Sequence, residues 1–123
     1  MARLKDVVWL GSSKRDLADF PDEVQDEVGH HLYEAQQGLK PANAKPLKGY
    51  GGPACLRLLK TLTRTPTYRA VYTVEFQEAI YVLHCFMKKS KRGAETPRQD
   101  AELIDRRYKQ AQEEHKRWQK ENQ

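Results

Sequence analysis

The sequence predicts an α+β fold in which an N-terminal helical hairpin packs on a small antiparallel sheet and a long helix closes the chain. Two runs, residues 68–74 and 79–87, are rich in aromatic, β-branched and small residues, a composition that favours strands. Residues 24–35 instead carry apolar side chains at helical spacing. The Thr-Pro pair at 96–97 has the composition of a helix start, and apolar residues recur at helical spacing after it.

The N-terminal part alternates between strand and helix signals. A short strand candidate, residues 6–11, comes first. Ser13 and Asp16 have the spacing of a capping box, in which a hydroxyl and a carboxylate bind backbone N–H groups at a helix start. A second helix is expected from Pro21 to Gly38, because proline suits a first turn and glycine suits the left-handed end of a helix. The apolar stripe of that helix is formed by Val24, Val28, Leu32 and Ala35.

The middle of the chain is expected to be a loop followed by three strands. Residues 40–53 hold three prolines and three glycines, which indicates a loop. Residues 54–63 are a strand candidate, and strands 68–74 and 79–87 are expected to pair antiparallel through a hairpin loop. The last of these strands is apolar on both alternating sets, which predicts a central strand covered on both faces. Strict alternation places Ile80, Val82, His84, Phe86 and Lys88 on one face and Tyr81, Leu83 and Met87 on the other.

The charges are unevenly distributed along the chain. The net charge is +5; residues 1–34 hold four Lys/Arg and eight Asp/Glu, residues 35–94 hold eleven and two, and residues 95–123 hold seven and seven. A basic middle of this kind favours a polyanionic partner such as RNA or DNA. Basic surfaces are common in proteins, so charge alone leaves the partner open.

Length and composition narrow the class of protein. Without repeats or linkers, residues 1–123 are expected to form a single domain, in which residues from about 112 to 123 are a polar helical tail. No stretch has the apolar length of a membrane span and the N-terminus lacks the hydrophobic run of a signal peptide, so no membrane contact and a cytoplasmic location are expected. No group of His, Cys, Asp and Glu has the spacing of metal ligands, so neither a metal nor another cofactor is expected. Cys55 and Cys85 are interpreted as thiols of the core.

The order of these elements, together with five short segments, resembles the RelE/ParE superfamily of bacterial toxin–antitoxin modules, and more closely its HigB-like, phage-derived branch. The segments are AKPLKG at 44–49, LRL at 56–58, YRAVY at 68–72, YVLH with FMKKSK at 81–91, and TP at 96–97. Each is short, but the ordered set is specific and spans most of residues 4–112. The resemblance implies a RelE-like α+β toxin that cleaves mRNA, usually in the ribosomal A site, and that is silenced by a cognate helix-turn-helix antitoxin of the HigA type.

The resemblance also implies roles for individual residues. Arg57 falls at the strand arginine of the superfamily, and Arg69 falls at the arginine of its tyrosine-arginine strand motif. Lys88, Lys89 and Lys91 match the basic exit of the last strand in the HigB-like branch.

RNA cleavage through the 2′-hydroxyl needs a base, a cation that stabilises the phosphorane, and an acid for the leaving 5′-oxygen. The chain offers cations at Arg69 and Lys88, and proton carriers at His84, Tyr68 and Tyr72. Histidine is the residue type among these whose ordinary pKa lies near neutrality, although a histidine on an apolar strand face is more often packed than catalytic. The predicted catalytic residues are Arg69, Lys88, Lys89, His84 and Tyr72, and the predicted RNA-binding residues are Lys48, Arg57, Lys91 and Arg92.

Two other functions stay open. A non-catalytic inhibitor of DNA gyrase, as in the ParE branch of the superfamily, has the same fold, and fold does not separate the two. A nucleic-acid-binding module without activity is the third possibility, but single-strand binders are expected to expose an aromatic ladder, and the tyrosines here are needed for the core. The basic middle and the lysines after the last strand favour an mRNA endoribonuclease that inhibits translation.

Overall fold

The computed structural model of the chain describes residues 4–39, 44–46, 55–61, 67–88 and 98–122. Side chains are described for all of these except 44–46, 55–61, 67 and 88. The elements are β1 (Asp6–Trp9), α1 (Ser13–Ala18), α2 (Asp22–Gln36), β2 (Ala44–Pro46), β3 (Cys55–Thr61), β4 (Thr67–Thr73), β5 (Ala79–Lys88) and α3 (Arg98–Glu121).

The strands form one five-stranded sheet in the order β1-β5-β4-β3-β2. The pairs β3–β4 and β4–β5 are antiparallel, as predicted for the strands at 54–63, 68–74 and 79–87. The pair β2–β3 is antiparallel as well, although the sequence predicts no strand at β2. The prediction of an antiparallel sheet is wrong at one edge, because β1 pairs with β5 in parallel. Strand composition carries no information on direction, which is set here by the long connection through two helices and three strands. The sheet is therefore mixed, and β5 is an interior strand, as its two apolar faces predict.

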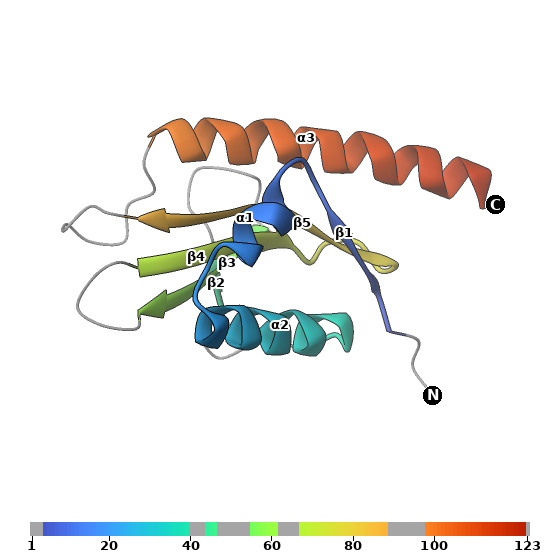
Figure 1. The fold of residues 1–123 in the computed structure, drawn as a ribbon. Coiled ribbons are helices and arrows are strands. Elements are labelled where there is room, and N and C mark those ends of the chain that lie inside the picture. The colour runs from blue at the N-terminus through green and yellow to red at the C-terminus, as the bar shows by residue number, and fades with distance from the viewer. Residues whose placement is uncertain (1–3, 40–43, 47–54, 62–66, 89–97, 123) are drawn as a thin grey trace.

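Helices cover both faces of this sheet, α2 on one and α3 on the other (Figure 1). On the α2 face, the buried stripe Val24, Val28, Leu32 and Ala35 meets residues of β4 and β5, including Ala70, Ile80 and Val82. On the α3 face, Ile104 and Ala111 meet Val71, Tyr81, Leu83 and Phe86. The predicted pair of N-terminal helices is present, but α1 has only six residues and packs chiefly on β5. Their pairing as a hairpin stays a prediction.

Two local predictions at the N-terminal helices and the following loop are wrong. The residue before α1 is Ser12, and the Ser13 hydroxyl, instead of capping the helix, donates to the Val82 carbonyl across 3.2 Å. Ser13 is fully buried, so its hydroxyl has no access to water and needs a hydrogen-bond partner inside the protein. The Val82 carbonyl is that partner. Within the predicted loop 40–53, residues Ala44–Pro46 are a short edge strand, and the rest lies outside the described residues. The left-handed end of α2 is confirmed, since Gly38 has a φ of 84°.

The last helix, α3, runs for 24 residues and reaches Glu121. Its predicted start, Thr96 and Pro97, lies outside the described residues. Within the predicted polar tail, His115 is buried, and its Nε2 atom lies 2.8 Å from Glu78 Oε2. None of the helices in the described ranges is long and apolar enough to cross a membrane.

Candidate functional site

A β-bulge in β5 decides which side chains share a face. Val71 pairs with His84, but the next residue, Tyr72, pairs with Val82, so Leu83 is an extra residue in β5 without a partner in β4. A bulge of this kind breaks the alternation of side chains along the strand. Ile80 and Val82 therefore pack on the α2 face while Phe86 packs on the α3 face. The prediction that His84 shares the face of Ile80 and Val82 is wrong for this reason.

The bulge brings His84 to the face of Arg69. On β4, Arg69 and Val71 are two residues apart before the irregularity, and Val71 packs in the cluster on the α3 face. Arg69 is the direct partner of Phe86, and Val71 is the direct partner of His84, so the two candidate residues occupy adjacent rows of one strand pair. Arg69 is 2% exposed and His84 is 7% exposed. A guanidinium stays charged in proteins, so the structure keeps a buried cation on this face of the sheet.

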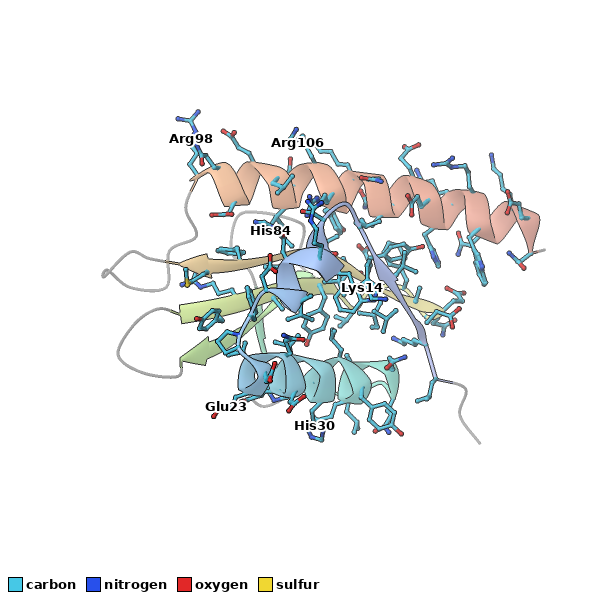
Figure 2. The ribbon with its side chains drawn as sticks, viewed as in Figure 1. Lys14, Glu23, His30, His84, Arg98 and Arg106 are labelled. Carbon is cyan, nitrogen blue, oxygen red and sulfur yellow. The ribbon has the colours of Figure 1, made fainter. Side chains whose placement is uncertain are left out.

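The His84 ring is held from two sides. Its Nε2 atom lies 2.6 Å from the Asp100 Oδ1 atom, which belongs to the first turn of α3. The ring stacks on Phe86 with a centroid distance of 4.7 Å and an interplanar angle of 15°. The other nitrogen, Nδ1, is buried and has no hydrogen-bond partner in the described part of the chain. Figure 2 shows His84 between β5 and α3.

Tyr72, predicted as a proton carrier, lies on the opposite face. It is fully buried in the cluster beneath α2, together with Ala70 and Val82. Burial raises the pKa of its hydroxyl far above the ordinary value, and the nearby Glu34 carboxylate raises it further. The structure therefore does not bring Tyr72 together with Arg69 and His84.

The basic residues of the predicted site are described only in part. Lys88 is the last residue of β5, and its backbone pairs with Thr67. Arg57 lies in β3 opposite Val71, so Arg57, Val71 and His84 form one row across three strands. Four further residues lie outside the described ranges: Lys48, Lys89, Lys91 and Arg92.

Two residues of α3 that sequence reasoning missed support this arrangement. Asp100 contacts His84, and Arg107 donates from Nη1 to the carbonyl of the bulged Leu83 across 2.8 Å. A bulge leaves backbone groups without ladder partners, so this bond satisfies a carbonyl that the strand pairing does not. Arg107 also donates from Nη2 to Ser12 Oγ across 3.3 Å, and burial lowers the pKa of its guanidinium. Periodicity along α3 could mark both residues as facing the sheet, but not which strand residues they meet.

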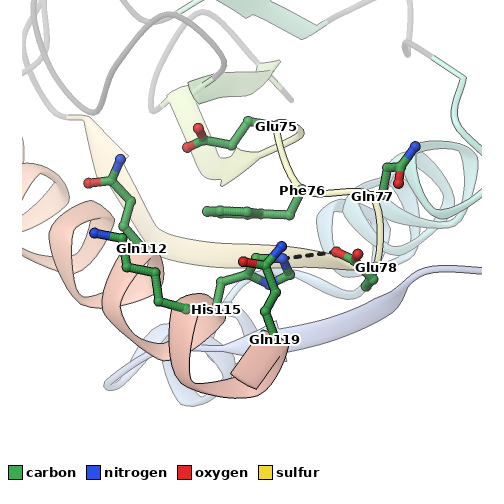
Figure 3. Close-up of a pocket in the computed structure, with 8 residues that line it drawn as sticks. Glu75, Phe76, Gln77, Glu78, Gln112, His115 and Gln119 are labelled. Atoms are coloured by element: carbon green, nitrogen blue, oxygen red, sulfur yellow. Dashed lines mark ion pairs between the residues drawn. The ribbon is translucent and has the colours of Figure 1, made fainter. Parts of the chain in front are cut away.

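A second group of titratable side chains lies at the other end of the sheet, beside the β4–β5 loop. His115 contacts Glu78 through Nε2 at 2.8 Å and the Tyr81 hydroxyl through Nδ1 at 3.3 Å, and it stacks on Trp118. It borders a cavity of about 350 Å³ between that loop and α3 (Figure 3). The other residues that line the cavity are Glu75, Phe76, Gln77, Glu78, Gln112, Lys116 and Gln119. This lining holds two carboxylates and a single cation, which does not suit a phosphate ligand.

The face of Arg69 and His84 is therefore the better candidate for chemistry on a polyanion. Its members supply a permanent cation and an imidazole, which are the groups that phosphoryl chemistry in the absence of a metal requires. Within the described residues, no group of three or more His, Cys, Asp or Glu side chains lies close enough to hold a metal ion.

Comparison with known proteins gives a family match over most of the chain. The family model described as "Phage derived protein Gp49-like (DUF891)" matches residues 15–109, from α1 to the middle of α3. The matched residues include Arg69, His84, Asp100 and Arg107. No curated protein and no solved structure matches the sequence.

Proposed function

The chain belongs to the Gp49-like family of phage-derived proteins, which are RelE/HigB-type toxins of toxin–antitoxin systems, and on that premise we propose that it is a ribosome-dependent mRNA endoribonuclease. Such a toxin stops translation by cutting the message in the ribosomal A site. It acts in the cytoplasm, without a metal or another cofactor, and its partner is a helix-turn-helix antitoxin of the HigA type.

The observation that supports this activity best is the shared face of Arg69 and His84. The bulge at Leu83 sets a buried cation and an imidazole in adjacent rows of β4 and β5. Lys88 follows as the last residue of β5. A charged group under low exposure stabilises a developing anion more strongly than the same group in water.

In the proposed reaction, the 2′-oxygen of one nucleotide attacks the adjacent phosphorus, and the bond from phosphorus to the 5′-oxygen breaks. The products are a 2′,3′-cyclic phosphate and a 5′-hydroxyl, so one proton leaves the 2′-oxygen and one arrives at the 5′-oxygen. His84 exchanges a proton with one of these oxygens and solvent water exchanges a proton with the other, while Arg69, Lys88 and Lys89 stabilise the phosphorane. The cations proposed to hold flanking phosphates are Lys48, Arg57, Lys91 and Arg92. Tyr72 supports β4 from the opposite face.

Primer extension on a translated reporter mRNA tests this function. After pulsed expression of the wild type, discrete new 5′ ends are expected, and they should disappear when translation of that message is blocked. Arg69→Ala and His84→Gln should remove the new ends, whereas Arg106→Ala, which removes an exposed arginine of α3, should not. Because a buried arginine supports the fold, circular dichroism and thermal unfolding must show that each variant folds. New ends of wild-type intensity from folded Arg69→Ala would contradict the proposed role of Arg69.

The alternative is a non-catalytic gyrase inhibitor, and one observation favours it. Both reactive side chains of the described site are more than nine-tenths covered, as a toxin that acts by binding alone would permit. Arrested growth with intact message and raised DNA-damage signalling would support this alternative and refute the endoribonuclease.

A further inference from the structure

The first turn of α3 closes the face that carries the proposed site. Asp100 Oδ1 lies 2.6 Å from His84 Nε2, and the neighbouring Ala101 and Ile104 are fully buried against the sheet. Arg69, on the same face, is 2% exposed. An RNA strand therefore does not reach the two side chains in the arrangement described.

The two nitrogens of the His84 ring differ in their access to a ligand. Its Nδ1 atom is buried without a hydrogen-bond partner in the described part of the chain, so it offers nothing to a ligand. Nε2 is the atom on the solvent side, because the Asp100 side chain that meets it is 27% exposed. The one nitrogen that a ligand can approach is thus occupied by a carboxylate oxygen of the protein itself.

We infer that Asp100 is an internal competitor for the proposed site, and that its carboxylate occupies the position which a phosphodiester oxygen of RNA takes at His84 Nε2. This inference rests on the proposed function in taking RNA as the ligand. A carboxylate and a phosphate are both anionic oxygen acceptors for an imidazole N–H group. RNA binding then requires the first turn of α3 to move away from β5, which exposes His84 Nε2.

The anchors of α3 show where this movement stops. Arg107 is held by Leu83 and Ser12, and further along His115 is held by Glu78. The first turn has a different set of contacts: Arg98 pairs with Glu102 inside the helix, and both side chains are largely exposed. Among the described residues, Asp100 to His84 is the polar contact between this turn and the sheet. Its loss removes the polar attachment of this end of the helix, while Arg107 and His115 still hold the rest.

The experiment measures affinity for an RNA oligonucleotide with 2′-deoxy substitutions, which cannot be cleaved through the 2′-hydroxyl. Fluorescence anisotropy compares the wild type with Asp100→Ala and Asp100→Asn. The control is Asp105→Asn, which makes the same change of charge on the same helix at a residue paired with Lys109 at 3.2 Å. We expect Asp100→Ala and Asp100→Asn to bind about tenfold more tightly than the wild type, equivalent to about 1.4 kcal/mol, and Asp105→Asn to change affinity by less than about twofold.

A second readout follows the imidazole itself. Nitrogen NMR of the histidine rings, with the His84 signal assigned from its loss in His84→Gln, should show a shift of Nε2 when the RNA binds to wild type. In Asp100→Asn the same signal should respond to inorganic phosphate at lower concentrations than in the wild type. Asp100→Asn keeps the size of the side chain, so it serves if Asp100→Ala fails to fold.

The inference is overturned if the Asp100 variants bind the RNA no more tightly than Asp105→Asn does. Binding weaker than that of the wild type would show instead that Asp100 orients His84 for catalysis. If the wild type cleaves mRNA and the Asp100 variants show no gain, this inference fails and the proposed function stands. If no RNA binds or is cleaved, but the His84 signal of Asp100→Asn responds to phosphate, the anion site stands and the proposed function fails.

Discussion

A substitution at Gly11 probes the contact that holds the bulge of β5. Gly11 has a φ of 52°, a left-handed conformation that side-chain-bearing residues rarely adopt. A Cβ atom placed there would lie 2.6 Å from Arg107 Nη2. The same guanidinium donates to the Leu83 carbonyl across 2.8 Å. Gly11→Ala therefore strains the backbone and also pushes Arg107 away from the bulge.

The two costs have separate magnitudes. A left-handed conformation costs an alanine about 1–2 kcal/mol relative to glycine. A hydrogen bond to a charged group contributes about 1.5–3 kcal/mol. If Arg107 is partly displaced, the protein loses part of this stabilisation. We expect Gly11→Ala to lower the free energy of unfolding by about 3 kcal/mol in the wild type, and by about 1–2 kcal/mol in an Arg107→Ala background, where only the backbone strain remains.

Urea unfolding of the four proteins of this cycle, followed by circular dichroism, gives the coupling energy directly. Gly11→Ala and Arg107→Ala should be less than additive by about 1 kcal/mol or more. An equal cost of Gly11→Ala in both backgrounds would refute the reasoning, because it would mean that Arg107 does not occupy the space beside Gly11 in solution.

Measurements at three further residues, Tyr72, Cys85 and Ile104, test the core and its titratable groups. Tyr72→Phe is expected to leave the free energy of unfolding unchanged or to raise it by up to about 1 kcal/mol, since its buried hydroxyl has no hydrogen-bond partner in the described part of the chain; a clear loss in urea unfolding would contradict this. Burial raises the pKa of the Cys85 thiol from 9.0 to about 12, so iodoacetamide at about pH 9 should label Cys85 only after unfolding, as mass spectrometry can show. Because the unfolded chain loses this proton first, the contribution of Cys85 to stability should be present below pH 9.0 and fall as pH rises towards about 12. Ile104→Ala, at a fully buried residue of α3, should cost about 2–5 kcal/mol in urea unfolding, while Ile104→Val should cost about 0.5–1.5 kcal/mol.

Much of the fold could be predicted because local patterns determine it. The spacing of Val24, Val28 and Leu32 identifies the buried side of α2, and the composition of residues 79–87 identifies an interior strand. The parallel direction of β1 could not be predicted, because direction depends on a connection rather than on composition. The short strand at Ala44–Pro46 was also missed, since an edge strand that contains proline looks like a loop in the sequence.

The candidate site was less predictable than the fold, and a single residue explains why. Strict alternation assigns His84 to the face of Val82, and the extra residue Leu83 moves it to the face of Arg69. No residue type in this stretch marks a bulge, since none is a glycine. The partners that stabilise the new arrangement, Asp100 and Arg107, come from a helix that is distant in the sequence.

The parallel pairing of β1 with β5 also has a consequence for the order in which the protein is made. Asp6 of β1 aligns with Ala79 of β5, so β1, the first strand to leave the ribosome, cannot pair until β5 has been synthesised. Until β5 has been made, Arg69 on β4 has no His84 beside it, because His84 belongs to β5, which follows β4 in the sequence. A nascent chain of this topology gains its site only after most of its own message has been read.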